Sequence, residues 1–579
     1  MPRNLPSAAD KIADSISYTS FGWRGGMRND VESYDMEDNE YLLGVNIRNR
    51  LGRISTIKNP KQLTNGLPAG SNPIQGIYGA GGIVVVIIKG RLYYRDFQDT
   101  RIDYFKTLTG FTLDPNVERI WAEIVPASTI NFVRKSTTNV DLDPQASDPI
   151  TFGAISGQVS PQVMLVMDGI NQALGITPKG NVFRTQNFQQ WSLQQGRREY
   201  VPIGIMPMYN GGILYIVSPD KKEVYRSVTG RPLDFVVAID QDGDKIQDGT
   251  FAVEASRLAI RPFGFDNITC ISRISIPDEG FFASTLNTCS LISVDRNNTL
   301  FGEPTFTFQS LFPTGVTNKF SIIDNLGDTA FVDISGIRTF NAIQQTRVEG
   351  RNAPFTQKLS FMFPDTILQN NSCAVEFNNY SIFSVETIYG SVLLVYDTLT
   401  QSWVSIDKYD NVGKITQFAE IKYAGVRRLF FANDSGQVYE AFADSTVANW
   451  KVYLKEMTTD KPEIEQKLDR ARFVFQNILQ DGSITVTNFV DRRLGQTLSK
   501  TVSMNASASI NVAPIEFPFG ASNEDAIDNF TYTFPEANRG WKIGLFVEGN
   551  VECELIGVEV LANIMTGKTS IEQQAKVYA

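Results

Sequence analysis

The chain has 579 residues, of which 42% are hydrophobic and 20% are charged, a composition typical of a folded globular protein. This length exceeds what one small core can organise, so we expect two or three domains, or one large β-domain with an appendage. The 63 Asp and Glu residues outnumber the 53 Lys and Arg residues, which leaves a formal net charge of −10. That balance argues against a dedicated nucleic-acid binder, although an acidic wall past which DNA slides is compatible with it.

The chain contains no histidine, which removes Ser-His-Asp and Cys-His catalysis and the commonest zinc and iron ligand sets. Enzymes built on carboxylates or lysine remain open. The four cysteines form no CxxC pair and are expected to be buried apolar residues: Cys270, Cys289, Cys373 and Cys553. No apolar run is long enough to span a membrane, and the opening sequence MPRNLPSAADKIADS lacks the apolar region of a signal peptide. Synthesis and use without Sec export are therefore expected.

Residues 1–60 are predicted to form an extended arm. The stretch FGWRGGMRNDVESYDMEDNEYLLGVNIRNRLGRIST carries the adjacent glycines Gly25 and Gly26, then an acidic segment, and no apolar period long enough for a helix. This polar segment stands directly ahead of a long series of apolar strands.

One hairpin pattern recurs over residues 61–445. A run of apolar residues is followed by a short polar turn and a second strand, with copies that begin at Ile83, Val163, Ile213, Leu291, Thr329, Val392 and Leu429. Several turns hold a glycine, as in Lys89-Gly90, which permits the positive φ of a tight hairpin. The mean spacing of about 58 residues exceeds that of a plain four-stranded blade, roughly 40–50 residues, so we expect inserted loops, notably residues 135–149. The pattern predicts an all-β fold, a β-propeller of six to eight degenerate blades.

The pattern of apolar and polar residues changes after about Thr446. The sequence RARFVFQNILQDGSITVTNFVDRR alternates apolar and polar residues, with Asp481-Gly482 predicted as a hairpin turn. A second strand pair is predicted around Gly549-Asn550. These patterns predict a separate β-sandwich-like domain over residues 446–565, followed by a polar tail over residues 566–579 that is loose or is ordered only by a partner.

Two acidic groupings suggest chemistry, and each has a simpler structural interpretation. A weak metal candidate places carboxylates at alternate positions around a glycine, but Phe251 stands where a calcium loop needs its last ligand; the three carboxylates belong to Asp240, Asp242 and Asp244. Carboxylate pairs for glycoside hydrolysis are conceivable in the centre of a propeller, but the candidates Asp168, Asp333 and Asp397 sit at hairpin turns, where Asp is favoured for local hydrogen bonding. We therefore predict no catalytic residue, cofactor or structural metal.

Trp403 ends a hairpin after an Asp-Thr turn. Tryptophans in this position commonly pack between adjacent blades, so a core role is expected.

The order of features in the arm resembles the N-terminus of the tail nozzle proteins of short-tailed bacteriophages, the family of tail tubular protein B and the packaged-DNA stabilisation proteins. The matching positions are Gly25, Gly26, Asp30, Asp35, Asp38, Glu40, Asn46, Gly52 and Ile54. A later Arg-Pro-Gly of the family is replaced by IKNP. Further elements resemble the family in the same order: NGGILYIVSPDKKEVYRSVTGRPLDF, LGDTAFVDISGIRTF, VLLVYDTLTQSWVSID, RLFFANDSGQVYEAF and the RARF strand.

The resemblance implies a structural protein of the virion tail, assembled in the host cytoplasm and without enzymatic activity. It implies a homo-oligomeric ring, usually a hexamer, below the portal and its adaptor protein and next to tail fibres or other tail proteins. Double-stranded DNA would pass non-specifically through the lumen and be retained until ejection. The arm would complete the propeller or clasp a neighbouring subunit.

Two other functions stay open on the sequence alone. The same propeller is compatible with a module that binds a host receptor or glycan, or with a carboxylate-based polysaccharide hydrolase. The ordered motif series favours the structural role, because the sequence shows no convergent polar cluster.

Overall fold

The structure is a computed structural model that describes residues 15–69, 72–107, 113–126, 162–170, 172–174, 202–227, 256–259, 266–273, 280–300, 303–312, 314–325, 328–340, 354–364, 367–369, 371–458, 465–490, 498–504, 530–533, 539–540 and 542–565. Within these ranges almost every regular element is a β-strand. The helical elements there are short 3₁₀ turns: η2 (Ser33–Asp35), η3 (Arg50–Gly52), η6 (Lys319–Ser321) and η7 (Gln357–Met362). None of the helices in the described ranges is long and apolar enough to cross a membrane.

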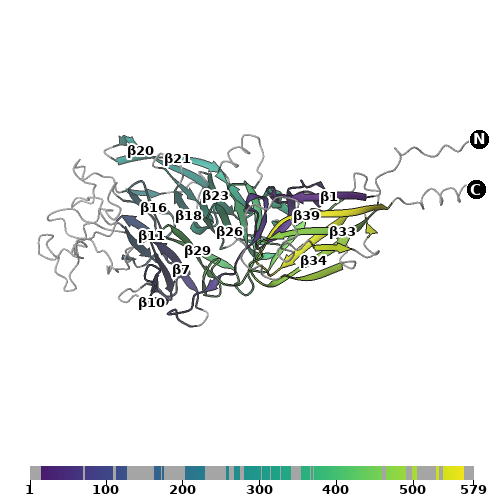
Figure 1. The fold of residues 1–579 in the computed structure, drawn as a ribbon. Coiled ribbons are helices and arrows are strands. Elements are labelled where there is room, and N and C mark those ends of the chain that lie inside the picture. The colour runs from purple at the N-terminus through teal and green to yellow at the C-terminus, as the bar shows by residue number, and fades with distance from the viewer. Residues whose placement is uncertain are drawn as a thin grey trace, which may run out of the picture.

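Seven antiparallel blades follow one another along the described part of the chain (Figure 1). Blades 1 to 4 contain β7 (Ile74–Ala80), β8 (Ile83–Ile88), β9 (Arg91–Asp96) and β10 (Lys106–Thr107); β11 (Trp121–Pro126), β12 (Gln162–Met167) and β13 (Gln172–Leu174); β14 (Ile205–Asn210), β15 (Ile213–Val217), β16 (Glu223–Arg226) and β17 (Ser256–Ala259); and β18 (Cys270–Arg273), β19 (Phe281–Ser284), β20 (Cys289–Leu300) and β21 (Glu303–Phe312). Blades 5 to 7 contain β22 (Ile322–Asn325), β23 (Asp328–Asp333) and β24 (Gly336–Thr339); β25 (Cys373–Phe377), β26 (Tyr380–Thr387), β27 (Gly390–Asp397) and β28 (Ser402–Asp407); and β29 (Ile415–Tyr423), β30 (Val426–Asn433), β31 (Val438–Glu440) and β6 (Lys61–Gln62).

The first strands of the blades surround a common hub. β7 contacts β11, β11 contacts β14, and β14 contacts β18. β18 in turn contacts η6, which leads directly into β22. On the other side β22 contacts β25, β25 contacts β29, and β29 contacts β7, which closes the ring. The last strand of blade 7 is β6, which precedes blade 1 in the sequence and pairs with β31. The predicted β-propeller is therefore confirmed, and the start of the chain closes it.

The β8–β9 hairpin shows how the sequence encodes a blade. All six residues of β8 are buried. Lys89 and Gly90 both adopt positive φ, 50° and 70°, as a two-residue type I′ turn requires. A Cβ on Gly90 would overlap the carbonyl oxygen of Leu113, so packing demands glycine here as well as backbone conformation.

One predicted hairpin, the copy from Leu291, is wrong. Its polar residues do not reverse the chain, because β20 runs through them as one strand paired with β21. The register of that pairing shifts between Asp295 and Thr299, so an irregularity absorbs the extra polar residues. The hairpin of blade 4 instead joins β19 to β20, between Ser284 and Cys289.

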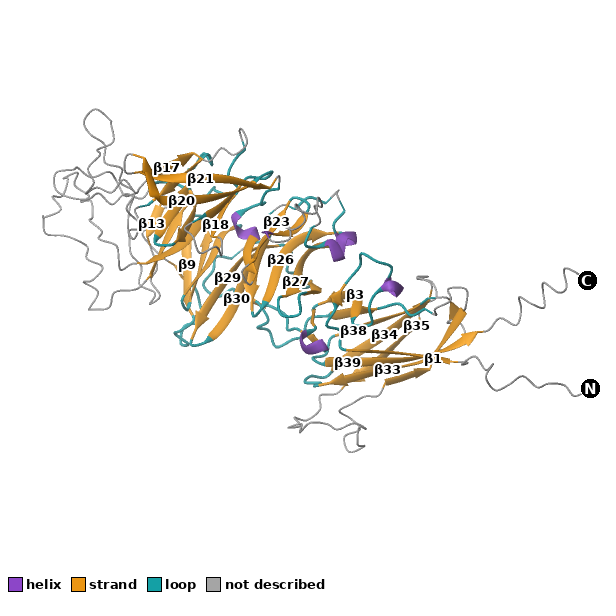
Figure 2. Cartoon of the chain, turned by 90° about the horizontal axis from the view of Figure 1, so that it is seen from above, coloured by secondary structure: helices purple, strands orange, loops and turns teal. Residues whose placement is uncertain are grey.

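A seven-stranded sheet and the far part of the sheet that contains blade 6 form a β-sandwich at the opposite end of the molecule (Figures 1 and 2). One sheet contains β1 (Ser15–Phe21), β4 (Ile47–Arg48), β5 (Ile54–Thr56), β33 (Glu465–Gln476), β36 (Phe530–Thr533), β37 (Arg539–Gly540) and β39 (Glu554–Met565). The other contains β2 (Gly26–Met27), β3 (Glu40–Val45), β32 (Trp450–Leu454), β34 (Gly482–Val490), β35 (Leu498–Met504) and β38 (Ile543–Gly549). Buried side chains of both sheets share one hydrophobic cluster, as in a sandwich core.

The two turns predicted as hairpins in this domain join different sheets. β33 pairs with β39 whereas β34 pairs with β38, so Asp481-Gly482 lies in a crossing between the layers. The same holds for Gly549-Asn550 between β38 and β39. Both predicted pairings around these turns are therefore wrong. Turn residues of this kind suit a crossing between layers as well as a hairpin, so the sequence does not distinguish the two. The two crossings lie together, and Asn550 Oδ1 accepts a hydrogen bond from Ser483 N at 2.9 Å.

The segment predicted as an arm contributes strands to both domains. β1, β4 and β5 enter one sheet of the sandwich, and β2 and β3 enter the other. β6, which follows the predicted arm directly, enters blade 7. β3 also pairs in parallel with β28 at Val45 and Ile406, so one ten-stranded sheet runs from blade 6 into the sandwich (Figure 2). A single hydrophobic cluster contains Trp403 of blade 6 and Phe473 of the sandwich. The predicted insertion at 135–149 and the predicted tail lie outside the described residues.

Candidate functional site: the arm joint and the hub cup

Motif positions far apart in the sequence meet where the arm contacts blade 6. Gly26 has φ +77°, and a Cβ there would overlap the carbonyl oxygen of Trp403. Gly25 is packed equally closely against the acidic stretch, and Gly52 at φ +81° lies against the backbone of the preceding turn. Only glycine permits these approaches. We call the contact of residues 23–52 with blade 6 and the start of β32 the arm joint.

Asn46 links the two domains through one side-chain amide. Its Nδ2 donates to the carbonyl oxygen of Lys408 at 2.9 Å and to that of Asn449 at 2.6 Å. Its Oδ1 accepts from Lys408 N at 2.8 Å. Lys408 follows β28 directly and Asn449 precedes β32, so the amide spans propeller and sandwich. The residue has φ 55°, a conformation that asparagine tolerates better than most residues.

A buried ion pair lies in the arm joint. The Arg48 guanidinium donates from Nη2 to Asp407 Oδ2 at 2.6 Å and from Nη1 to Oδ1 at 2.9 Å, a bidentate arrangement. The two side chains are only 9% and 0% exposed. Burial lowers the pKa of Arg48, but the adjacent Asp407 carboxylate more than compensates, so this pKa is raised overall. The charged pair thus joins β4 to β28 away from solvent.

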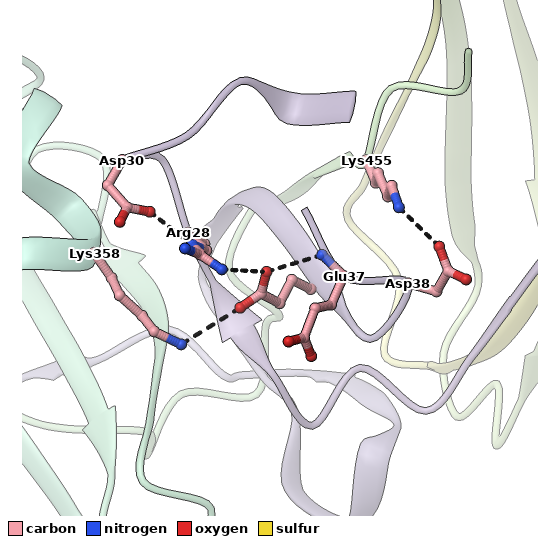
Figure 3. A network of polar contacts seen from close by, with 7 residues as sticks. Arg28, Asp30, Glu37, Asp38, Lys358 and Lys455 are labelled. Atoms are coloured by element: carbon pink, nitrogen blue, oxygen red, sulfur yellow. Dashed lines mark hydrogen bonds and ion pairs between the residues drawn. The ribbon is translucent and has the colours of Figure 1, made fainter. Parts of the chain in front are cut away.

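Glu40 holds the acidic stretch on the propeller side through two cations. These cations, Arg28 and Lys358, are labelled in Figure 3. The Glu40 carboxylate is buried and pairs with Arg28 Nη1 and with Lys358 Nζ, each at 3.4 Å. Arg28 Nε also donates to Asp30 Oδ1 at 2.7 Å. The backbone N–H of Glu37 donates to Glu40 Oε2 at 3.1 Å. The acidic residues of the motif therefore fold the arm against η7, which carries Lys358.

On its other side the acidic stretch faces the sandwich. Lys455 Nζ donates to Asp38 Oδ1 at 2.9 Å (Figure 3). Lys542 Nζ lies 4.0 Å from the centre of the Tyr34 ring, a cation–π distance. These contacts border a cavity of about 980 Å³ between β1 and residues 454–458.

Trp403 is a core residue of blade 6. Its side chain is 3% exposed and lies 5.0 Å from the ring of Tyr396 and 5.1 Å from that of Phe355, between ring centres. Its carbonyl faces Gly26, so one residue supports both the blade and the arm.

The carboxylates considered for hydrolysis do not converge. Asp168, Asp333 and Asp397 lie in blades 2, 5 and 6, and each accepts a hydrogen bond from the backbone N–H two residues later, at 2.7 to 2.9 Å. They stabilise their own turns. The residues of the weak metal candidate lie outside the described residues: Asp240, Asp242 and Asp244.

An aromatic side chain, Phe320 of η6, spans the propeller hub. Its ring stacks on Trp121 of β11, with centres 5.0 Å apart and planes 4° apart, and Tyr78 of β7 lies 6.3 Å away. The Arg119 guanidinium lies 5.0 Å from the same ring. Phe320 packs against the hydrophobic cluster of blades 6 and 7 as well as that around Trp121, so it bridges opposite sides of the hub.

Beside Phe320, which we call the hub plug, polar side chains from several blades face one another. Glu123 of β11 and Arg273 of β18 line two adjoining cavities of about 490 and 520 Å³. The first cavity is also lined by Asn210 of β14, Lys319 of η6 and Asp324 of β22. We call this concavity the hub cup.

Glu123 is the electrostatic centre of the hub cup. Its Oε1 accepts from Arg273 Nη2 at 2.5 Å and from Tyr209 N at 3.2 Å, and Lys319 Nζ lies 3.9 Å from its Oε2. Lys319 Nζ also donates to the carbonyl oxygen of Pro207. Burial lowers the pKa of Lys319, and the Glu123 carboxylate offsets only part of this effect.

The sequence patterns gave no indication of the hub cup. Its charged residues stand singly in short strands, as Glu123 does in WAEIVP and Arg273 in CISR. The available signal was a charged side chain in an otherwise apolar strand, but using it requires knowing which strand of each blade lines the hub. Only ring closure brings these positions together.

No protein-family model matches the chain, and no curated protein matches it. Among solved structures, the chain is similar to BBS1N from its complex with ARL6DN, at 9% identity and a TM-score of 0.33, over 68% of this chain and 98% of that one. It is also similar to the AfRom2 CNH domain, at 8% identity and a TM-score of 0.33, over 66% of this chain and 98% of that one. The propeller assignment above depends on the sheet order and the closed ring of first strands.

Proposed function

We propose that this chain is a structural virion protein, a nozzle subunit of a short bacteriophage tail that surrounds the DNA exit channel in several copies. One observation carries the proposal: motif positions spread over about 380 residues meet at the arm joint. Gly26 packs on Trp403, Gly52 on the arm itself, and Asn46 on both domains.

The mechanical role fits the construction of the arm joint. A nozzle has to keep its shape while a packaged genome presses on it. The shared hydrophobic cluster, the continuous sheet and the Arg48–Asp407 pair resist rotation of the propeller against the sandwich. The proposed role therefore gives a reason for a costly buried ion pair between the two domains.

In this proposal DNA passes between copies of the chain. Phe320 packs against both sides of the hub of a single propeller, so we place the lumen in a ring of copies, for which we propose six below a portal adaptor. The net charge of −10 lowers non-specific adhesion of duplex DNA, because few basic groups are offered to its phosphates.

Electron microscopy of the purified full-length chain, together with gold labelling of purified virions, tests the proposal. We expect rings with a central lumen and label at the tail tip. A protein that stays monomeric at high concentration and is absent from virions overturns the proposal. A filter-binding assay with duplex DNA adds a second test, since tight and salt-sensitive binding contradicts an acidic, low-adhesion channel.

A further inference from the structure

We propose that the hub cup binds a small ligand that carries one oxyanion, a carboxylate or a phosphate, next to hydroxyl groups. The proposal goes beyond the virion role and does not depend on it. It rests on the convergence of Glu123, Arg273 and Lys319 on a concavity in the middle of the propeller.

The cavity has the size and lining of a small-molecule site. Pockets for small ligands usually measure roughly 300–1,000 Å³ and combine apolar walls with a few polar groups. The hub cup cavities measure about 490 and 520 Å³, and Met208 and Ile271 supply apolar walls. A ligand held here contacts several blades at once, which fixes its orientation.

The ammonium of Lys319 uses only part of its hydrogen-bonding capacity in the hub cup. Arg273 Nη2 occupies Glu123 Oε1 at 2.5 Å, whereas Lys319 Nζ lies 3.9 Å from Oε2, beyond hydrogen-bond distance. Within the described residues the remaining partner of the Lys319 ammonium is one backbone carbonyl, that of Pro207. An ammonium has three donors, so a partly buried Lys319 has capacity for an added anion.

An oxyanion is the group that best completes this arrangement. The cavity wall carries two cations, Arg273 and Lys319, and two carboxylates, Glu123 and Asp324. Lys319 is the cation there that lacks a close carboxylate partner, because its Nζ lies 3.9 Å from Glu123 Oε2. Charge-assisted hydrogen bonds to an oxyanion are stronger than those between neutral groups, especially where water is scarce. The Asn210 amide and the Ser272 hydroxyl line the same cavity and suit neighbouring hydroxyl groups of the ligand.

Calorimetric titration of the full-length protein tests the assignment with three probes: sodium D-glucuronate, sodium phosphate and D-glucose. We expect saturable binding of glucuronate or phosphate and none of uncharged glucose. Binding of glucuronate alone identifies a sugar carboxylate as the ligand group, and binding of phosphate alone identifies a phosphate. Absence of saturable binding of both anions, or equal binding of glucose, overturns the proposal.

Variants locate the site. Lys319→Met should weaken binding of the active probe at least tenfold, while Lys422→Met, at an exposed position in blade 7, should leave it unchanged. Arg273→Gln provides an independent variant, because its side chain is 57% exposed and its loss should not impair folding. Equal affinity in Lys319→Met, Arg273→Gln and the wild type places the binding elsewhere and overturns the assignment.

Discussion

The arm joint and the hub cup both gather charged residues from distant parts of the chain, yet their charges are satisfied differently. In the arm joint, Arg48 and Asp407 meet in two hydrogen bonds of 2.6 and 2.9 Å, away from solvent. In the hub cup, Lys319 stays 3.9 Å from Glu123 and borders an open cavity. A cluster that completes its own hydrogen bonds holds structure together, whereas one with spare donors beside a cavity is able to bind.

Breaking the ion pair of the arm joint should have the largest effect. Asp407→Ala leaves the Arg48 guanidinium buried without its partner, which typically costs about 3–5 kcal/mol of unfolding free energy. Urea denaturation measures the loss. The double variant Arg48→Met with Asp407→Leu should recover most of it, because no uncompensated charge remains. A loss under about 1 kcal/mol for Asp407→Ala would show that the pair does not hold the arm joint.

Gly26→Ala should cost about 3 kcal/mol, since it combines a strained left-handed backbone with overlap of the Trp403 carbonyl oxygen. Gly390→Ala is the matched control, because Gly390 has φ +84° but no neighbouring atom within 4 Å of the new Cβ. Backbone strain alone should cost that variant about 1 kcal/mol. Thermal unfolding of the two variants separates the cost of the steric overlap at Gly26 from the cost of the left-handed backbone. Equal losses of stability would argue that the overlap contributes little.

The variant Phe320→Ala tests how much the hub plug beside the hub cup contributes to stability. Because Phe320 is partly exposed, its removal should cost about 2 kcal/mol, less than for a fully buried ring. The loss should appear in urea denaturation with an unchanged all-β circular dichroism spectrum. A variant as stable as the wild type would mean that the ring contributes little to closing the hub.

Lys319→Met should change stability by no more than about 1 kcal/mol, and in the stabilising direction, since it removes a partly buried charge. The pKa of Lys319 is lowered in the folded protein, so the unfolded chain binds this proton more tightly. The free energy of unfolding that it contributes therefore rises with pH from the folded pKa up to the ordinary value of 10.5. Denaturation curves between pH 7 and 10 should lose this rise in the variant; an identical pH dependence would contradict the assignment.

The smallest effect is expected for thiol labelling. All four cysteines are free and buried. Burial raises the pKa of Cys270, Cys373 and Cys553 to about 12 and that of Cys289 further. The propeller thiols and the sandwich thiol Cys553 should therefore all resist a thiol reagent at pH 8 and react in denaturant. Faster native labelling of Cys270 than of Cys553 would reveal local opening at the hub cup.

Much of the fold was predictable because its signals are local. Turns such as Lys89-Gly90 need positive φ, and the apolar run of β8 needs burial on both faces. The blades can therefore be recognised from short stretches of sequence. The change after Thr446 is likewise a change in local alternation. The hub cup has no such signal, because its charged residues are isolated positions in short strands and in η6.

The sequence by itself determined the strand content, most hairpin turns and the need for glycine at close backbone approaches. Only the tertiary structure decided which sheet each strand joins: that Asp481-Gly482 crosses between layers, that the arm enters both domains, and that Glu123 faces Lys319. The physical reason is the range of the interactions. A turn is stabilised within four residues, whereas pairing partners are selected by burial and hydrogen bonding across the whole chain.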